Sequence, residues 1–352
     1  MVNVAVLGYG VVGSGVVELM DKNNKIFSQK INQSIDVKYI LDVRDFPGDK
    51  YEQKHIKDFN IILNDPEVSI VVETIGGAKI AYEFTKKSLL AGKNVVTSNK
   101  ELVATKAPEL LAIAREKNVK YLFEGSVGGG IPIIRPLYHC LAANELNKIV
   151  GILNGTTNYI LTKMVKEHMP FDRALQNAKE LGYAENNPAS DIEGIDTCRK
   201  ICILASLAFG KHIYPQNVYT MGIQNIVLSD IEKAAAQGYV IKLLGSAVKD
   251  ENGFVDIFVS PCAIKNSHTL ANIEDVFNGI TVTGDAIGDV TFYGRGAGKF
   301  PTASAVGADI IECAKDTQRQ NILWVDSDNE FVHSFDKLHF NYLEGTNILV
   351  IE

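Results

Sequence analysis

Short apolar runs alternate with amphipathic segments along the first third of the chain. The runs predict strands at Val2–Leu7, Val37–Leu41, Ile70–Glu73, Asn94–Thr97 and Lys120–Phe123. Residues 80–91 and 108–117, which lie between the later runs, carry apolar side chains at helical spacing. Such alternation of strands and helices is typical of a parallel sheet covered by helices. The pattern therefore predicts an α/β fold for the N-terminal part of the chain.

The pattern changes at residues 125–132, where glycines gather. A glycine cluster lets the backbone turn tightly or approach a ligand, and we expect this one to end the first domain. Further along, the sequence predicts a long helix over Ile192–Phe209 and neighbouring strands over 239–248 and 254–259. We therefore expect a second, α+β domain. The expected ranges are 1–130, completed by 300–352, for the first domain and 131–299 for the second, although chain order alone assigns the strand-like tail 321–352 to neither.

A glycine fingerprint follows the first predicted strand and opens a helix. Gly8 permits a tight turn, Gly10 lets the backbone approach a pyrophosphate, and Gly13 lets the helix pack against the strand. The N-terminus of that helix offers unpaired N–H groups to phosphate. The same glycines also occur in simple strand-to-helix turns, but the βαβ context favours a Rossmann-type dinucleotide-binding domain. The residues expected at the dinucleotide are Gly8, Tyr9, Gly10, Val11, Val12 and Gly13.

An acidic and a basic side chain both follow the strand that ends at Leu41. Asp42 favours the free 2′-hydroxyl of NAD, whereas Arg44 favours the 2′-phosphate of NADP, so both cofactors stay open. Thr74 and Lys100 follow the next two strands, at the sheet edge where parallel sheets bind ligands. Lys100 is equally well placed as an ordinary surface lysine at the start of a helix.

The densest polar segment, residues 182–200, leads directly into an apolar helical stretch. Asp196 and Lys200 are four positions apart, so a helix places them on one face. The simplest interpretation is an exposed ion pair worth about 0.2–0.5 kcal/mol. The apolar residues that flank the pair instead indicate burial, which would lower the pKa of Lys200 and suit it to proton exchange with a reacting oxygen. Asp196 would then orient the lysine.

Several stretches of the chain together closely resemble the homoserine dehydrogenases. They are residues 8–13, 98–100, 124–132, 151–159, 182–200, 296–298 and 301–306. The third, fourth and fifth stretches are specific to that family rather than general to Rossmann folds. The resemblance implies reversible reduction of L-aspartate 4-semialdehyde to L-homoserine in threonine, methionine and isoleucine biosynthesis. Hydride would pass between the substrate C4 and the nicotinamide of NADP or NAD, and the second domain would bind the substrate and form the dimer.

The resemblance also implies roles for individual residues. Lys200 is expected to donate the proton to the aldehyde oxygen, with Asp196 beside it and Lys100 as a second lysine. The expected substrate-binding residues are Glu185, which would hold the amino group, and Asp191, Tyr183, Gly155 and Thr156. The expected cofactor contacts beyond the glycine fingerprint are Arg44, Thr74, Ser98, Lys100, Gly296 and Gly298. Carboxylates for the substrate ammonium group and cations around its oxygens form a chemically coherent set.

The glycine stretch after Glu124 encloses a monovalent cation in the family, usually sodium. By position, the resemblance implies that backbone carbonyls and a carboxylate from Glu124, Val127, Gly129 and Ile131 hold the ion. Oxygen ligands suit a hard cation rather than a transition metal. A glycine hinge without an ion is the alternative interpretation of the same spacing.

Composition limits the partners and the location. A formal net charge of −7 provides no basic surface for nucleic acid. The most apolar stretch, Ile201–Gly210, is ten residues long and too short to span a bilayer. The N-terminus lacks the pattern of a signal peptide, and the five cysteines suit free thiols in a reducing compartment. We therefore expect a cytoplasmic protein without nucleic-acid or membrane partners. The resemblance further implies a homodimer, in a short form that lacks a C-terminal ACT domain.

Two other classes of function fit the sequence less well. Dehydrogenases with a nucleophilic cysteine need it at the start of a helix, with a histidine to take its proton. Cys140 and Cys198 fall at the end and in the interior of predicted helices, respectively. A regulatory cofactor sensor, the second class, would not need the lysines and carboxylates of the polar segment.

Overall fold

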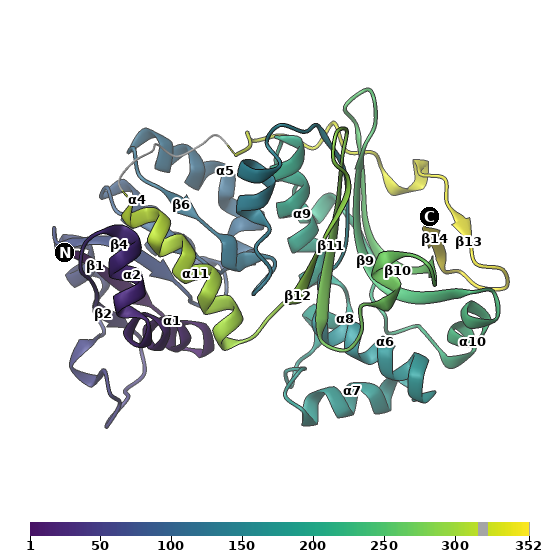
Figure 1. Ribbon diagram of the computed structural model, residues 1–352, viewed down its shortest axis with the longest axis horizontal. Helices are drawn as coiled ribbons and strands as arrows, with labels where there is room; N and C mark the ends of the chain where they lie inside the picture. The colour runs from purple at the N-terminus through teal and green to yellow at the C-terminus, as the bar shows by residue number, and fades with distance from the viewer. Residues whose placement is uncertain (316–322, 352) are drawn as a thin grey trace. The chain divides into compact units, whose positions relative to one another are not determined.

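The computed structural model describes residues 1–315 and 323–351 (Figure 1). The chain forms two compact units, each built from two segments. The first unit contains Met1–Arg135 and Ala297–Asp326, and the second contains Pro136–Gly296 and Ser327–Glu352. The α/β class predicted from the sequence is confirmed, since a parallel sheet forms the first unit and a mixed sheet the second.

The first unit contains a six-stranded sheet in which every pairing is parallel. In spatial order, its strands are β3 (His55–Ile56), β2 (Ile35–Leu41), β1 (Val2–Leu7), β4 (Val68–Glu73), β5 (Asn94–Thr97) and β6 (Tyr121–Leu122). Every residue of β1 is buried, as expected for a central strand with helices on both faces. The strand order reverses between β1 and β4, and ligands bind beyond the carboxyl ends of strands at such a switch point.

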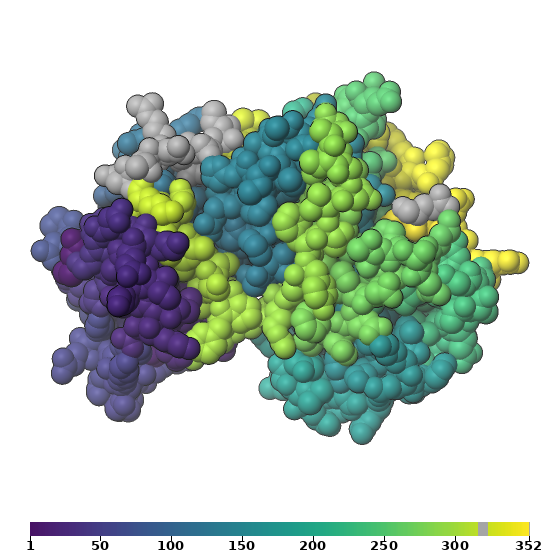
Figure 2. Space-filling view, in the orientation of Figure 1, coloured from purple at the N-terminus to yellow at the C-terminus, as the bar shows by residue number. Residues whose placement is uncertain are grey.

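Helices from both ends of the chain cover this sheet. They are α1 (Val11–Lys22), α2 (Asn24–Ile31), α3 (Phe59–Asn64), α4 (Lys79–Leu90), α5 (Lys100–Glu116) and α11 (Lys299–Ala314). Figure 2 shows the atoms of α11 packed against the N-terminal segment, and α11 indeed contacts α1. The contact needs a small residue, because a Cβ on Gly15 would lie 2.8 Å from the Lys299 side chain. Val306 and Ile310 of α11 complete the apolar core beneath β1.

The second unit contains a mostly antiparallel sheet. In spatial order, its strands are β12 (Gly288–Arg295), β11 (Phe277–Gly284), β7 (Leu146–Ile152), β9 (Tyr239–Lys249), β10 (Val255–Lys265), β14 (Leu349–Ile351) and β13 (Asn341–Tyr342), and β8 (Tyr219–Thr220) also pairs with β10. β9 and β10 are eleven residues each and pair along their whole length. This hairpin matches the neighbouring strands expected from the sequence.

The helices of the second unit bring polar side chains to the sheet. They are α6 (Gly155–Glu167), α7 (Phe171–Glu180), α8 (Ala189–Ile192), α9 (Ile195–Phe209) and α10 (Leu228–Ala236). α9 packs against β7 and β9. It approaches closely because β9 has a glycine there: a Cβ on Gly245 would lie 3.0 Å from Ile201 and 3.2 Å from Thr197. Shorter helical turns occur at Glu52–Lys54, Glu124–Ser126, Pro136–Cys140, Pro215–Asn217, Thr269–Asn272 and Phe335–Lys337.

The C-terminal tail differs from the expectation that 300–352 completes the first domain. α11 and residues 323–326 do belong to the first unit, but the chain from Ser327 onward joins the second. β14 pairs with the edge of β10, and Phe335 stacks on Tyr219 with ring centroids 3.6 Å apart. An exposed strand edge offers unpaired backbone groups, and the tail covers them. The part of the prediction at 316–322 lies outside the described residues.

No helix in the described ranges is long and apolar enough to cross a membrane. This finding agrees with the short apolar stretch in the sequence of α9.

Candidate active site

The glycine fingerprint forms a tight turn between β1 and α1. Gly8 has a φ of +89°, and a Cβ there would lie 2.9 Å from the Thr74 carbonyl oxygen. A Cβ on Gly13 would lie 1.9 Å from the Gly8 carbonyl, whereas one on Gly10 meets nothing within 4 Å. Gly8 and Gly13 are therefore needed for packing, and Gly10 leaves the backbone open to a ligand. The Thr74 hydroxyl donates to the carbonyls of Leu7 and Gly8, each at 2.9 Å, and fastens the turn.

α1 begins directly after this turn, with Gly10 at its N-cap position. Glycine has no side chain with which to satisfy the first N–H groups of the helix, and Val11 in the first turn is 68% exposed. The helix N-terminus therefore presents free N–H donors and a partial positive charge to solvent. This is the arrangement that binds phosphate in dinucleotide folds.

Asp42 and Arg44 form one ion pair beside the same turn. Asp42 Oδ2 accepts the Tyr9 N–H at 2.7 Å, and Arg44 donates to both carboxylate oxygens at 3.0 and 2.9 Å. The Arg44 guanidinium holds the pKa of Asp42 well below its usual range. Arg44 also reaches the Tyr9 carbonyl at 3.1 Å, while its side chain stays 59% exposed. The acid that favours NAD and the base that favours NADP thus lie together at the turn.

The fingerprint tyrosine points away from the phosphate-binding backbone. The Tyr9 ring is buried, and it meets Phe46 and His55 edge-on with centroids 5.0 and 4.8 Å away. Its hydroxyl donates to Asp49 at 3.3 Å. Tyr9 therefore contributes its backbone to the site, and its side chain anchors the segment after β2.

A buried carboxylate lies at the end of β4 and was not predicted from the sequence. Glu73 is fully buried, and burial raises its pKa to about 7. It accepts hydrogen bonds from the Thr97 hydroxyl at 2.5 Å and the Ile75 N–H at 2.6 Å. Asn99 caps α5 and donates to the Ile75 carbonyl at 3.1 Å, so these contacts order the two strand ends. Ser98 and Lys100, the predicted cofactor contacts beside Asn99, are half-buried.

The lysine and aspartate of α9 form a buried ion pair. Lys200 Nζ lies 2.8 Å from Asp196 Oδ2, and the side chains are 8% and 2% exposed. Lys200 also donates to the Leu153 carbonyl at 2.8 Å. The alternative of an exposed surface pair is therefore excluded. Leu153 follows β7, so the sheet and the helix together orient the ammonium group.

A second carboxylate joins this pair through an asparagine. Asn154 Nδ2 donates to Asp191 Oδ1 at 2.8 Å and to Asp196 Oδ2 at 3.0 Å. Burial, and next the charge of Asp196, raise the pKa of Asp191. Asn154 was not among the site residues predicted from the sequence. Asn154 is the N-cap of α6, a common role for asparagine, and nothing local in the sequence indicates its second role.

The other predicted substrate-binding residues lie at the start of α6 and in the turn after α7. The Thr156 hydroxyl donates to the Tyr183 carbonyl at 2.8 Å and thereby holds the turn after α7. Glu185 in that turn is exposed, and Tyr183 is 44% exposed. Gly155 packs tightly, because a Cβ there would lie 2.7 Å from the Val276 carbonyl.

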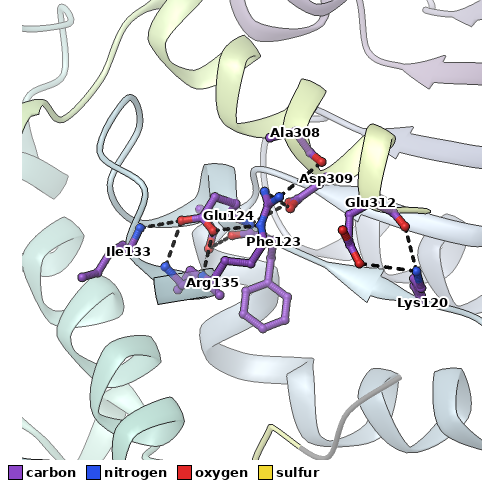
Figure 3. A network of polar contacts seen from close by, with 10 residues as sticks. Lys120, Phe123, Glu124, Ile133, Arg135, Ala308, Asp309 and Glu312 are labelled. Atoms are coloured by element: carbon purple, nitrogen blue, oxygen red, sulfur yellow. Dashed lines mark hydrogen bonds and ion pairs between the residues drawn. The ribbon is translucent and has the colours of Figure 1, made fainter. Parts of the chain in front are cut away.

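The glycine loop after β6 is held by one buried carboxylate (Figure 3). Glu124 Oε1 accepts the N–H groups of Ile133 and Ile134 at 2.7 and 2.8 Å, and Oε2 accepts that of Arg135 at 2.9 Å. The Glu124 N–H donates to Asp309 Oδ2 at 2.8 Å, and Arg135 pairs with Asp309 Oδ1 at 2.8 Å. Burial raises the pKa of Asp309 to about 8. The network ties the loop to α11.

The backbone of this loop carries buried candidate ligands for a cation. Glu124, Val127, Gly129 and Ile131 are buried. Their backbone carbonyl oxygens are the candidate ligands of the ion. The Glu124 carboxylate, by contrast, already accepts the three N–H groups. Backbone carbonyl oxygens fit a hard monovalent ion, so the carbonyls rather than the already hydrogen-bonded carboxylate suit the predicted role. The described chain contains no cluster of three His, Cys, Asp or Glu side chains that would hold another metal.

A dinucleotide fingerprint at a sheet switch point and a buried lysine–aspartate pair define an NAD(P)-dependent oxidoreductase. The family profile "Homoserine dehydrogenase, NAD binding domain" matches residues 8–124, and "Homoserine dehydrogenase" matches residues 132–311. The chain belongs to the homoserine dehydrogenase family, as its sequence resemblance predicted.

Individual relatives support this membership. A homoserine dehydrogenase of Lactococcus lactis is 39% identical over 320 residues, which cover 89% of this chain and 74% of the relative. One from Synechocystis is 42% identical over 321 residues, covering 88% and 72%. The crystal structure of a homoserine dehydrogenase from Thiobacillus denitrificans has a TM-score of 0.89 at 36% identity, over 96% of this chain and 80% of that one. A hyperthermophilic archaeal homoserine dehydrogenase in complex with NADPH has a TM-score of 0.76 at 27% identity, over 90% and 99%.

Proposed function

We propose that Lys200 is the proton donor in the reversible reduction of L-aspartate 4-semialdehyde to L-homoserine, and that Asp196 orients it. The observation that carries this proposal is the buried ion pair, in which Nζ lies 2.8 Å from Asp196 and 2.8 Å from the Leu153 carbonyl. When bound, NAD(P)H supplies hydride to C4. The Lys200 ammonium gives a proton to the aldehyde oxygen as negative charge develops there, and in the reverse direction neutral Lys200 takes the hydroxyl proton.

We assign the substrate's ammonium group to the acidic side of this cluster. Asp191 lies 2.8 Å from the Asn154 amide, and the family resemblance supports Glu185 as a partner of the amino group. Gly155, Thr156 and Tyr183 complete the substrate set, with the Thr156 hydroxyl ordering the turn that carries Tyr183 and Glu185. A zwitterionic amino acid is thereby matched by carboxylates at one end and by Lys200 at the reacting end. Lys100 is assigned as the second lysine.

The glycine fingerprint, Gly8 to Gly13, is assigned to the pyrophosphate of NADP or NAD. Arg44 supports NADP, because its exposed guanidinium can pair with a 2′-phosphate, while Asp42 supports NAD. Thr74, Ser98, Lys100, Gly296 and Gly298 are assigned as further contacts. Gly296 must lack a side chain, since a Cβ there would overlap Asn278 at 1.8 Å, and Gly298 has a φ of +117°.

We further propose that the carbonyls of Glu124, Val127, Gly129 and Ile131 bind sodium. Their burial and the oxygen-only ligand set support this site. The family resemblance supports a cytoplasmic homodimer that forms through the second sheet. The outer strand β12 of that sheet carries Tyr293, which is 59% exposed and stacks on Phe277.

Substitution of Lys200 tests the catalytic proposal. We expect Lys200→Ala to lower kcat by roughly two to four orders of magnitude with the fold retained, because a positioned acid contributes about that much. Initial rates of homoserine oxidation, followed by absorbance of the reduced cofactor, measure the effect with NAD and with NADP. Lys163→Ala is the matched control, since Lys163 forms an i,i+4 pair with Glu167 at the surface. A folded Lys200→Ala enzyme within tenfold of wild type would contradict the assignment.

A further inference from the structure

We propose that Asn154 is a positioning residue that bridges Asp191 and Asp196 and aims Asp196 at Lys200. The proposal rests on the roles assigned above to these charged residues. Asn154 is 6% exposed, and its single amide nitrogen donates to both carboxylates, at 2.8 and 3.0 Å. One amide group therefore spans the two acids.

Two carboxylates and one lysine make this buried cluster negative overall when all three are charged. Like charges repel strongly in a medium of low dielectric constant, so both acids need donors to remain ionised side by side. Asp196 has the Lys200 ammonium at 2.8 Å. Asp191 receives the Asn154 N–H, and that hydrogen bond favours its charged form. The amide thus supplies a donor to each acid without adding charge.

The orientation of the Asn154 amide is determined by its other end. Its Oδ1 accepts the Thr157 N–H at 2.9 Å and the Thr157 hydroxyl at 3.0 Å. A backbone N–H can only donate, so the oxygen must face Thr157 and the NH2 group must face the carboxylates. The N-terminus of α6 therefore fixes the orientation of the Asn154 amide.

The neighbouring residue links the bridge to the lysine. Leu153, directly before Asn154, accepts a hydrogen bond from Lys200 Nζ through its carbonyl. The Leu153–Asn154 pair therefore contacts Lys200 through its backbone and Asp196 through its side chain. If the amide is removed, Asp196 keeps Lys200 but loses the contact that directs Oδ2, so the direction of the ammonium is fixed less closely.

Serine at position 154 separates this role from helix capping. A serine hydroxyl caps a helix about as well as asparagine does, but it is too short to reach both acids and has only one hydrogen to donate. We expect Asn154→Ser to lower kcat for homoserine oxidation by about 10–100-fold, as misplacement of a catalytic group does. The KM for NAD(P) should stay within about twofold, and the KM for homoserine should change less than kcat. Asn154→Asp also keeps the cap and should lower kcat at least as much.

Asn158 is the matched control. It lies one turn further along α6, is 1% exposed, and its amide donates to the carbonyls of Ile273 and Phe277 at 3.1 and 3.0 Å. Asn158→Ser should lower the melting temperature yet leave kcat within about threefold, because no acid of the cluster contacts it. Equal kcat in Asn154→Ser and wild type, or parallel losses of kcat and stability in both serine variants, would overturn the proposal. An active Lys200→Ala enzyme would instead overturn the catalytic assignment on which the proposal rests.

Discussion

Replacing Glu124 with glutamine tests how much one buried carboxylate contributes to the glycine loop. In the wild type, Oε1 accepts hydrogen bonds from the backbone N–H groups of Ile133 and Ile134, and Oε2 accepts one from the Arg135 N–H at 2.9 Å. Glutamine keeps one acceptor oxygen for the first two donors. Its NH2 group, however, faces the Arg135 N–H, so two donors meet in a buried place.

The cost follows from these contacts. A buried donor without an acceptor costs about 1–3 kcal/mol, and a hydrogen bond to a charged group is worth about 1.5–3 kcal/mol. Arg135 Nε also lies 3.5 Å from Oε2, but the guanidinium keeps Asp309 at 2.8 Å, which limits the loss. We therefore expect Glu124→Gln to destabilise the protein by about 2–4 kcal/mol. For a unit of this size, that is about 5–15 °C in melting temperature.

Urea and thermal unfolding of Glu124→Gln and Glu312→Gln measure the effect. Glu312 is the matched control, because its carboxylate is 31% exposed and lies 3.7 Å from Lys120, which also donates to the Glu312 carbonyl. Its loss should cost less than about 1 kcal/mol. Exchanging choline chloride for sodium chloride should raise the melting temperature of wild type but not of Glu124→Gln, whose loop no longer aligns the carbonyls. Equal stability of the two variants would refute the reasoning.

Two further predictions concern the first unit. Burial raises the pKa of Glu73 from 4.5 to about 7, so its protonated form stabilises the fold fully below pH 4.5, and that contribution is lost as the pH rises to 7. Between pH 4.5 and 7, the free energy of unfolding of wild type, measured in urea titrations, should fall by about 3 kcal/mol relative to that of Glu73→Gln. A difference between the two proteins that does not change with pH would contradict burial of this carboxyl as the cause. Arg44→Ala should lower the ratio of kcat/KM for NADP to that for NAD by about 10–100-fold, since it removes a charge-assisted bond to phosphate. Equal changes with both cofactors would count against Arg44 as the phosphate contact.

The parallel sheet was predictable because its signal is local. All five predicted strands are present, with ends within two residues of the prediction, since buried parallel strands are nearly continuous apolar runs. The short β3 at His55–Ile56 was not predicted, because two residues leave no periodic pattern. The tail after Ser327 was also misassigned. Its strand β14 pairs with β10, where Leu349 lies opposite Cys262, and β13 pairs with β14. No local pattern in the sequence indicates a partner that far away.

The candidate site also contains residues with a local sequence signal and residues without one. The spacing of Asp196 and Lys200 predicts one helix face, and the apolar residues around them predicted the burial that the structure confirms. Asn154 and Glu73 were missed, because an N-cap asparagine and a strand-end glutamate have ordinary local explanations. Their hydrogen bonds join them to other elements. Asn154 donates to Asp191 and Asp196, and Glu73 accepts from the Thr97 hydroxyl.

The sequence by itself determined what depends on neighbouring positions: the strands and helices of the first unit, the phosphate-binding turn and the lysine–aspartate face of α9. Helical and strand periodicities repeat within a few residues, so a linear pattern encodes them. Only the tertiary structure decided which distant groups share a buried hydrogen bond, such as Asn154 between two acids or Glu124 beneath three backbone N–H groups. Buried polar groups form hydrogen bonds with whichever groups the packing places beside them, and those groups can be far away in the sequence.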